Sequence, residues 1–440
     1  MELMYISYLT NQYQFLYIDI YEASVYLIDK KTSPAFSKES IFLQVKNHPN
    51  VKVTSMRVAM LSWESLHSIS IGGVAAVVSE MAAAMERKGH EVHVFTRMGG
   101  GQSHYQQIDG VHYHRCPFNL QSNFIDEIND MCRSFVHHFF QTEDFVGSFD
   151  IVHAHDWLTS NAAVWIKYGR GKKVALTIHS TEYGRCGNNF WAGQSARIRD
   201  HERHGTYCAD RVMTVSHALK NEIMWMYNVP EWKTRVVYNG INYHHFDGWI
   251  NPSEVKAAYG IGPVDSTTLF VGRMTYQKGP DLLVEAIPFV LNYYPHAKFI
   301  FVGEGDMRHS LESRAWSLGI AHATRFLGYR SGQELINLYK ASDVVCVPSR
   351  NEPFGIVILE AWSAGKPVVA SCNGGPSEFV WHEVDGLKIY DNPESIAWGI
   401  GNMFKDFEHA RWMGRNGRTA VETSFSWDSI ADQVLHIYQE

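Results

Sequence analysis

The chain has 440 residues, of which 45% are hydrophobic and 19% are charged, and its formal net charge is −7. This length predicts two domains of about 200 residues each, and the composition is that of a globular protein. The acidic balance disfavours nucleic acid as a partner, because nucleic-acid-binding surfaces carry an excess of Lys and Arg. No run of about 18 apolar residues occurs, so no stable membrane insertion is expected.

The cysteines and the first residues bear on the compartment. Six cysteines are spread along the chain and none forms a C-x-x-C pair, which argues against a zinc or redox motif. We interpret them as buried, reduced thiols. The first twenty residues lack a basic leader and a small-residue cleavage site, so they do not form a secretory signal. Together these features predict a cytoplasmic protein.

Residues 1–55 show no clear hydrophobic periodicity, and we interpret them as an N-terminal extension of unknown role. Met56 stands just before the first predicted strand, so translation starting at Met56 is an alternative. A chain that begins at Met56 is then expected to be soluble and active.

A βαβ unit opens at the short apolar run Met56–Leu61. The pair Gly72-Gly73 follows, then a helical pattern from about Val74 to Lys88, and then a strand pattern at Glu91–Thr96. Strand, glycine turn, helix and strand in this order predict a parallel sheet.

Short apolar runs, each followed by Gly, Asn or Pro, recur along the rest of the chain. Such runs are typical of strands buried on both faces of a doubly wound sheet. The two series, separated by Asn239-Gly240, lie at 150–154, 174–178, 211–215 and 235–238, and at 268–272, 298–302, 324–327, 343–347 and 367–371.

The sequence therefore predicts an α/β protein of two Rossmann-like domains, residues 56–240 and 241–425, with a hinge near 239–250. Residues 426–440 have a cap-like start at Ser426 and apolar residues with helical spacing. We expect this closing helix to pack back on the first domain. Ligands bind at the carboxyl ends of the strands in such folds, so we expect the active site in the cleft where the two sheets face each other.

Two carboxylates stand on either side of a predicted helix start, in the segment Asn351–Glu360. Glu352 lies in the loop before the helix, and Glu360 lies one to two turns inside it. Carboxylates at these points can accept hydrogen bonds from the hydroxyl groups of an extended ligand. The alternative is an acid that complements the helix dipole and a second, solvated Glu.

Two cations lie just past another strand, in the segment Phe270–Gly279. Arg273 and Lys278 can stabilise the negative charge that develops on a diphosphate leaving group. The alternative interpretation is two exposed loop cations. The glycine turns Gly72-Gly73 and Gly374-Gly375 each connect a strand to a helix, where backbone amides can approach an anion.

Three histidines end first-domain strands. His153 and His155 share one side of a strand, which makes a metal pair conceivable, although no third ligand is apparent. His179 ends the next strand, where an imidazole can donate a hydrogen bond to a sugar hydroxyl. A core or edge histidine is the alternative for each of them.

These segments resemble motifs of the retaining GT-B glycosyltransferases, the group 1 or family 4 enzymes that include sucrose-phosphate synthases and the related glycogen and starch synthases. Glu352 and Glu360 match the E-x7-E motif, and the segment of Arg273 and Lys278 matches G-R-x4-K-G. The string His153–Trp157 resembles the H-A-H-D-W of glycogen synthases. The resemblance covers most of residues 56–440 and has several motifs in the same order.

The resemblance implies a role for each of these residues. Glu352 would contact the hydroxyls of the donor sugar, Glu360 the ribose, and Arg273 and Lys278 the diphosphate. Gly73 and Gly375 would close around the donor, and His179 would stabilise the reacting sugar. On the acceptor side the resemblance places His155, Asp156 and, in a glycine-containing loop, Arg185.

Two further segments bear on the nucleotide. Gly303-Glu304-Gly305 lacks the third glycine of a dinucleotide fingerprint, because position 308 is Arg. Phe326–Arg330 resembles the family loop whose backbone contacts the base. Tyr329 and Arg330 would stack on that base, or else have only structural roles.

The resemblance implies a metal-independent transfer of a hexose with retention of configuration. The favoured donor is ADP- or UDP-glucose and the favoured acceptor is a glucan, by similarity to the glycogen synthases. Another donor, such as a mannosyl nucleotide, with a small or lipid-linked acceptor is the alternative within the family. A nucleotide-sugar epimerase and a non-catalytic carbohydrate-binding protein are the alternatives outside it.

Overall fold

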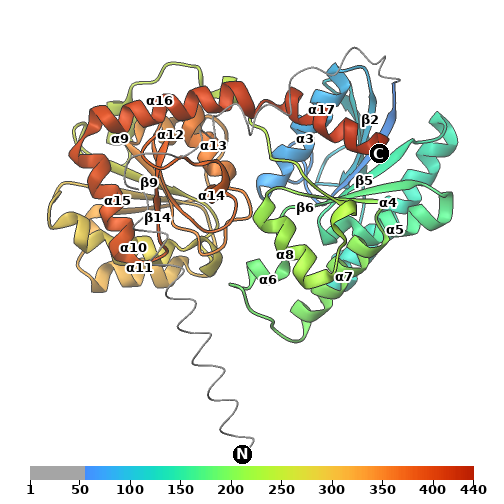
Figure 1. Cartoon of the computed structure of the whole chain (residues 1–440), viewed down its shortest axis with the longest axis horizontal. Coiled ribbons are helices and arrows are strands. Elements are labelled where there is room, and N and C mark those ends of the chain that lie inside the picture. The colour runs from blue at the N-terminus through green and yellow to red at the C-terminus, as the bar shows by residue number, and fades with distance from the viewer. Residues whose placement is uncertain (1–54) are drawn as a thin grey trace, which may run out of the picture. The chain divides into compact units, whose positions relative to one another are not determined.

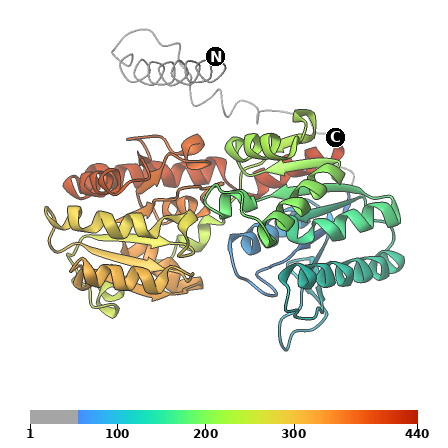
Figure 2. The same ribbon diagram turned by 90° about the horizontal axis from the view of Figure 1, so that it is seen from below.

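The computed structural model describes residues 55–440 (Figure 1). The predicted extension, residues 1–55, lies outside the described residues except for Ser55. The described chain contains two lobes, each built on one twisted sheet with helices on both of its faces, as Figure 2 shows from a second direction.

The first lobe contains an eight-stranded sheet in the order β3-β4-β2-β1-β5-β6-β7-β8, in which only the β3–β4 pair is antiparallel. The strands are β1 (Arg57–Ser62), β2 (Glu91–Arg97), β3 (Tyr105–Ile108), β4 (Val111–Cys116), β5 (Ile151–His155), β6 (Lys173–Ile178), β7 (Arg211–Thr214) and β8 (Thr234–Val236).

Most helices of this lobe begin either at a residue whose side chain caps the first turn or at a glycine. The side chains of Asn123 and Ser216 accept hydrogen bonds from the first-turn amides of α4 and α8, whereas α3 begins without such a cap at Gly72. The helices are α3 (Gly73–Arg87), α4 (Phe124–Val146), α5 (Trp157–Arg170), α6 (Glu182–Arg185), α7 (Gln194–Cys208) and α8 (His217–Tyr227).

The second lobe contains a six-stranded parallel sheet in the order β11-β10-β9-β12-β13-β14. Its strands are β9 (Thr267–Val271), β10 (Lys298–Val302), β11 (Thr324–Gly328), β12 (Val344–Val347), β13 (Val368–Ser371) and β14 (Gly386–Ile389). Its helices are α9 (Pro252–Ala258), α10 (Pro280–Leu291), α11 (Arg308–Ser317), α12 (Gly332–Ala341), α13 (Ile356–Ser363), α14 (Pro376–Phe379), α15 (Pro393–Lys405) and α16 (Phe407–Ser424).

The predicted fold class, two Rossmann-like parallel-sheet domains, is confirmed. Each predicted strand coincides with an observed one to within one or two residues. Strands β3, β4 and β14 were not predicted from the sequence. β3 is an exposed, polar edge strand, β4 alternates buried with half-buried residues, and β14 is only four residues long, so none presents the continuous apolar run of a central strand.

The last helix, α17 (Trp427–Gln439), lies beside α3 of the first lobe (Figure 1). Its apolar face is part of the same buried cluster as residues of β1, β2 and α3. Ion pairs at its exposed edge join Asp428 to Arg87 and Asp432 to Lys88. The polypeptide therefore crosses between the lobes twice, once before α9 and once after α16.

The two crossing segments run side by side. The amide of Ile241 donates to the carbonyl of Phe425 at 2.8 Å. Gly240 lies against the Trp427 ring so closely that a Cβ atom at this position would be 2.7 Å from it. A side chain larger than hydrogen is therefore excluded where the crossing segments meet.

No helix among residues 55–440 is long and apolar enough to cross a bilayer.

Candidate active site

Glu352 lies at the carboxyl end of β12, in the loop before α13, and is 6% exposed. Both of its carboxylate oxygens accept from the Lys278 ammonium at 2.8 Å, and Oε2 also accepts from the Ser349 hydroxyl at 2.8 Å. The structure thus brings together Glu352 and Lys278, which lie 74 positions apart in the chain. A ligand that contacts one of these side chains comes within reach of the other.

Backbone contacts fix the Glu352 loop to the glycine turn after β13. The amide of Gly375 donates to the Glu352 carbonyl at 2.8 Å. A Cβ atom at Gly375 would be 2.6 Å from the Cα of Phe354, and one at Gly374, where φ is +79°, would be 2.2 Å from the Glu352 carbonyl oxygen. Only glycine allows this approach, so the glycine pair is needed to hold Glu352 in place.

Arg273 follows β9, and its guanidinium donates a long hydrogen bond of 3.4 Å to Gln277. Desolvation and the nearby Arg185 lower the pKa of Arg273, while Glu352, Glu64 and Asp156 act in the opposite direction. The Arg273 side chain is exposed, so its guanidinium can reach an anionic ligand.

His179, at the carboxyl end of β6, is held through its backbone by the neighbouring strand end. Its amide donates to the Asp156 carboxylate at 2.7 Å. Asp156 itself has φ +59°, an uncommon conformation for a residue other than glycine. Such strained positions are concentrated at functional sites, and here the conformation directs the carboxylate toward His179.

His155 is 1% exposed, and its Nδ1 lies 3.0 Å from Nε2 of His179, so one ring nitrogen donates and the other accepts. Burial lowers the pKa of both histidines, which keeps the pair neutral near pH 7. We expected His155 to line the cleft on the acceptor side. Because it is buried, it contacts His179 rather than solvent, and their hydrogen bond couples the tautomers of the two rings.

His153 is fully buried and both of its ring nitrogens are engaged. Nε2 lies 2.7 Å from the Thr177 hydroxyl, and Nδ1 lies 2.6 Å from the hydroxyl of Tyr438 in α17. Within residues 55–440 no group of three or more His, Cys, Asp or Glu side chains could hold a metal ion.

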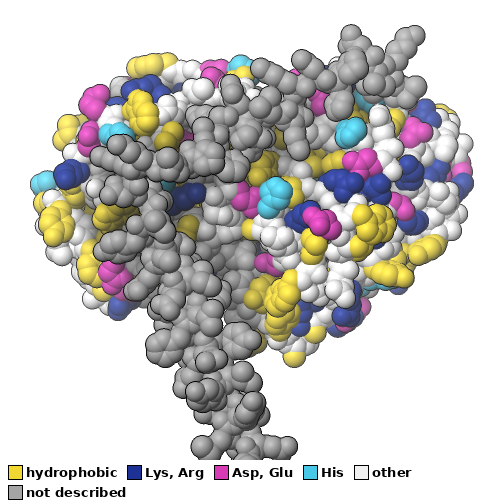
Figure 3. All heavy atoms as spheres, viewed as in Figure 1, with side chains coloured by type: hydrophobic (Ala, Val, Ile, Leu, Met, Phe, Trp, Pro, Cys, Tyr) yellow, Lys and Arg dark blue, Asp and Glu magenta, His cyan; other side chains and the backbone are white. Residues whose placement is uncertain are grey.

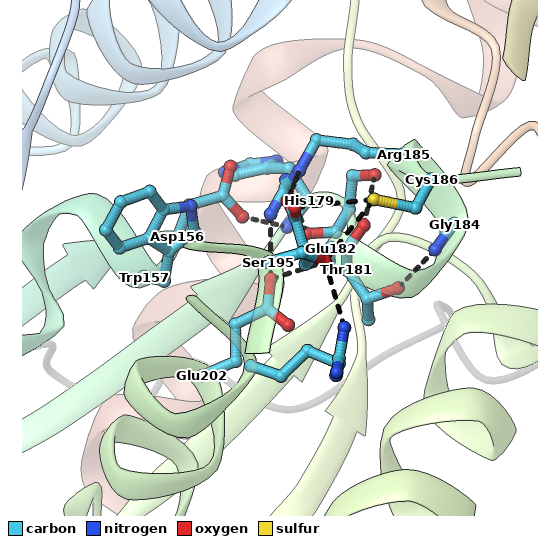
Figure 4. A network of polar contacts seen from close by, with 12 residues as sticks. Asp156, Trp157, His179, Thr181, Glu182, Gly184, Arg185, Cys186, Ser195 and Glu202 are labelled. Atoms are coloured by element: carbon cyan, nitrogen blue, oxygen red, sulfur yellow. Dashed lines mark hydrogen bonds and ion pairs between the residues drawn. The ribbon is translucent and has the colours of Figure 1, made fainter. Parts of the chain in front are cut away.

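Arg185 is held by two carboxylates (Figure 4). Its guanidinium lies 2.7 Å from Glu202 of α7 and 3.3 Å from Glu182 of its own helix, and it donates to the Ser180 carbonyl at 2.9 Å. Figure 4 shows these side chains turned toward one another, whereas Trp157 points away from them. Arg185 is therefore oriented by its own lobe before any ligand arrives.

The first glycine turn depends on a carboxylate that the sequence analysis missed. Glu64 is 5% exposed and accepts from the amides of Ile71 and Gly72 at 2.8 and 2.6 Å. Burial raises its pKa. At the next residue, Gly73, a Cβ atom would be 3.1 Å from Cδ1 of Ile356 in the second lobe. The sequence did contain a signal for this role, because Glu64 is an acid placed between the first strand and the glycine pair.

Two residues predicted to bind the donor, Glu360 and Arg330, already have partners within the protein. The Glu360 carboxylate accepts from the buried Tyr339 hydroxyl at 2.5 Å, and burial raises the pKa of Glu360. Arg330 is ion-paired with Glu334 at 2.7 Å, and Tyr329 is 54% exposed. The last two follow β11, the edge strand, and so lie apart from Glu352, which follows β12.

Direct hydrogen bonds join the lobes beside Glu352. Nδ2 of Asn351 donates to Oδ1 of Asn188 at 2.8 Å and lies 3.5 Å from a carboxylate oxygen of Glu222 in α8. Contacts between segments so far apart in the chain could not be predicted from the sequence.

The second contact caps a helix of one lobe with a carboxylate of the other. Glu378, in α14, accepts from the amides of His217 and Ala218 at the N-terminus of α8, at 2.9 and 2.7 Å. It also accepts from the Tyr238 hydroxyl at 3.0 Å. The negative charge complements the dipole of α8, so this contact favours the arrangement in which the lobes meet.

Profiles of known families match both halves of the chain. The profile described as glycosyl transferases group 1 matches residues 253–420, and that of glycosyltransferase family 4 matches residues 71–245. An uncharacterised glycosyltransferase of Methanocaldococcus jannaschii is 38% identical over 393 residues, covering 87% of this chain and 98% of its own. The chain therefore belongs to the group 1 glycosyltransferases.

More distant proteins share the same architecture. A glycogen synthase of Mycobacterium tuberculosis is 27% identical over 399 residues, covering 87% of this chain and 94% of its own. The sucrose-phosphate synthase of Thermosynechococcus elongatus has a TM-score of 0.74 at 23% identity and covers 87% and 98% of the two chains. HepE of Anabaena, solved with UDP-glucose, has a TM-score of 0.70 at 19% identity and covers 87% and 99%. These two structures share the fold of this chain.

Proposed function

We propose that this glycosyltransferase moves a hexose, glucose from ADP- or UDP-glucose in the favoured case, to a glucan or another sugar acceptor with retention of configuration. The observation that carries the proposal is the contact of Lys278 with both carboxylate oxygens of Glu352 at 2.8 Å, which places a cation for the phosphates next to an acid for the sugar hydroxyls. Similarity to a glycogen synthase and to a protein solved with UDP-glucose supports the choice of sugar and donor.

Arg273 and Lys278 would bind the diphosphate. The arginine can donate two parallel hydrogen bonds to phosphate oxygens, and the lysine adds a compact positive charge. Negative charge grows on the leaving diphosphate as the sugar bond breaks, so fixed cations stabilise the transition state more than the ground state. Because Lys278 is 2.8 Å from Glu352, a donor that binds both would have its phosphate end and its sugar at adjacent points.

Glu352 would accept hydrogen bonds from the sugar hydroxyls. Glu360 would contact the ribose while its carboxylate also accepts from the Tyr339 hydroxyl. His179 would act on the reacting sugar from the first lobe. Its neutral state suits a hydrogen-bond role rather than that of a fixed charge. Gly73 and Gly375 would let the backbone approach the donor, since neither carries a side chain.

Retention of configuration is what the family resemblance implies. The residues given roles do not include two carboxylates placed to flank the sugar bond, the arrangement of a retaining hydrolase. A phosphate oxygen of the departing diphosphate would then take the proton of the acceptor hydroxyl. The proposal includes no metal ion, because Arg273 and Lys278 would neutralise the diphosphate. Activity that persists in a chelator such as EDTA is the expected result, and loss of activity that Mg²⁺ restores would contradict this part.

The test is nucleotide release from ADP-, UDP- and GDP-hexoses, each with and without glycogen or maltooligosaccharides. Release of ADP or UDP from a glucose donor that depends on the glucan, with a lengthened α-linked product by NMR, is the expected result. Release from a GDP-mannose donor, or release indifferent to glucan, would contradict the assigned sugar and acceptor. Conversion of the donor sugar without nucleotide release would identify an epimerase.

A further inference from the structure

Aromatic side chains gather at the surface of the first lobe where α6 and the following loop meet α8. The ring centroids of Tyr183, Phe190 and Trp225 lie 4.8 to 5.9 Å apart. Phe190 is 58% exposed, Trp225 is 64% exposed and the adjacent Trp191 is 60% exposed. We call these four residues the aromatic platform. Figure 3 shows hydrophobic side chains gathered over the α6–α7 part of this lobe.

Exposure of a contiguous aromatic surface has a cost, since each Å² of apolar area left in water forgoes about 25 cal/mol. Contiguous patches of this kind mark interaction sites in soluble proteins. Single exposed aromatics elsewhere, such as Trp232 at 66%, need no such explanation, because the structure shows no ring contact for Trp232 among the described residues.

The platform is continuous with the candidate active site. Tyr183 lies on α6, the helix that also carries Arg185. Asn188 lies in the loop between Tyr183 and Phe190, and its side chain accepts from Asn351, the residue before Glu352. The platform therefore begins at the contact between the lobes, because Phe190 is only two residues after Asn188.

The other end of the platform is tied to the same contact through α8. Trp225 follows Glu222 by three residues, so the two share one face of the helix. Glu222 lies 3.5 Å from Nδ2 of Asn351. Both ends of the platform therefore lie next to Asn351, the residue before Glu352.

Polar groups of both signs surround the rings. The Arg199 guanidinium lies over the Phe190 ring at 5.3 Å and donates to the Trp191 carbonyl. Glu182 lies beside Tyr183 and is half-buried, and Asn189 is exposed. An anionic membrane would require an excess of cations here. The rim instead offers hydrogen-bond donors and acceptors in a mixture that suits a neutral, hydroxyl-rich ligand.

We propose that the aromatic platform binds the part of an oligosaccharide acceptor that extends beyond the transfer site. The apolar C–H faces of the sugar rings would pack on Phe190, Trp191 and Trp225, while hydroxyl groups would reach the polar rim. This inference rests on the proposed function, because it assigns the region of the acceptor next to the reacting hydroxyl.

The test compares the F190A/W225A variant with the wild type and with W232A, the matched control. Intrinsic fluorescence titrations with maltoheptaose measure binding without donor, and kinetic assays give the KM ratio of maltoheptaose to maltose. We expect the double variant to bind maltoheptaose about tenfold more weakly, the size of effect that removal of an aromatic anchor has at other binding surfaces. The KM ratio should rise in parallel. The W225F variant keeps an aromatic ring and should retain most of the affinity, and W232A should behave as the wild type.

Equal weakening of maltose and maltoheptaose, or equal affinity in the double variant and the wild type, would overturn the platform assignment. So would binding of the wild type to phosphatidylglycerol vesicles that the double variant loses, which would make this face a membrane surface. If the wild type binds no oligosaccharide but still releases nucleotide from a glucose donor, the platform inference fails while donor use stands. If it releases no nucleotide from any hexose donor, the proposed function itself fails.

Discussion

The guanidinium of Arg273 reaches Gln277 only through a long hydrogen bond of 3.4 Å, while charges of both lobes act on it. A cation placed in this way has little role in its own lobe and is available to a ligand. We therefore expect R273A to lower kcat/KM for nucleotide release at least about 100-fold, as does the loss of one charge-stabilising donor in other enzymes. R273K should retain part of the rate, because the charge remains but the paired hydrogen bonds are lost.

The matched control is R314A, since Arg314 is also an exposed arginine of the second lobe and forms an ion pair with Glu285 at 2.6 Å. Circular dichroism should show that all three variants are folded. A folded R273A protein with unchanged turnover would remove the diphosphate assignment.

His153 gives the protein a pH-dependent stability. Burial lowers its pKa to about 3, whereas an exposed histidine titrates near 6.5. Between these values the unfolded chain binds a proton that the folded chain does not. The free energy of unfolding therefore falls as the pH decreases below about 6.5, by at most about 1.4 kcal/mol per pH unit for this group.

We expect H153Q to lose less stability than the wild type when the pH changes from 7.0 to 5.5, by about 1 kcal/mol. Urea denaturation at the two pH values measures this difference. H309Q is the control, because His309 is exposed, and it should show the wild-type pH dependence. Identical pH dependence in H153Q and the wild type would mean that His153 takes up a proton in the folded state.

Helix α8 of the first lobe is capped by its own Ser216 and also by Glu378 of α14 in the second lobe. Glu378 accepts from the amides of His217 and Ala218, two of the groups that a helix leaves without an internal partner. Loss of a helix cap costs about 0.5–2 kcal/mol. In E378A we expect these two amides to exchange hydrogen about tenfold faster, with a smaller effect in E378Q, which keeps an acceptor oxygen.

Hydrogen-exchange mass spectrometry or NMR measures this protection. E394A is the control, because Glu394 also lies in the first turn of a second-lobe helix, α15, whose cap is provided by Asn392. Protection at His217 and Ala218 that is the same in E378A and the wild type would show that this contact between lobes does not form in solution.

At the scale of the whole molecule, α17 joins the end of the chain to the core of the first lobe. Trp427 is 5% exposed and packs against Gly240, where the two crossing segments meet. We expect W427A to lower the free energy of unfolding by about 3–5 kcal/mol, because a buried indole is replaced by a cavity. Urea denaturation followed by circular dichroism measures the loss.

W412A serves as the comparison, since Trp412 is 41% exposed on α16. Its loss should be much smaller than that of W427A. Equal losses in the two variants would show that the contact of Trp427 with the crossing segments adds nothing to stability.

Features that depend on local order could be predicted from the amino-acid sequence. Buried parallel strands need apolar runs, and strand-to-helix turns at a ligand need glycine, so both sheets and the segments of Glu352, Arg273 and His179 could be identified. The chemistry of each segment followed from residue type and spacing. Their family resemblance could also be recognised, because it is carried by short strings of neighbouring residues.

The pairing of these segments became known from the three-dimensional structure. The ion pair of Lys278 with Glu352, the hydrogen bond of His155 with His179, and the cap that Glu378 gives to α8 each join residues far apart in the chain. Burial made His155 an internal partner of His179 and revealed Glu64 under the glycine turn. Such contacts depend on how the lobes and strand ends pack, which no periodicity along the chain records.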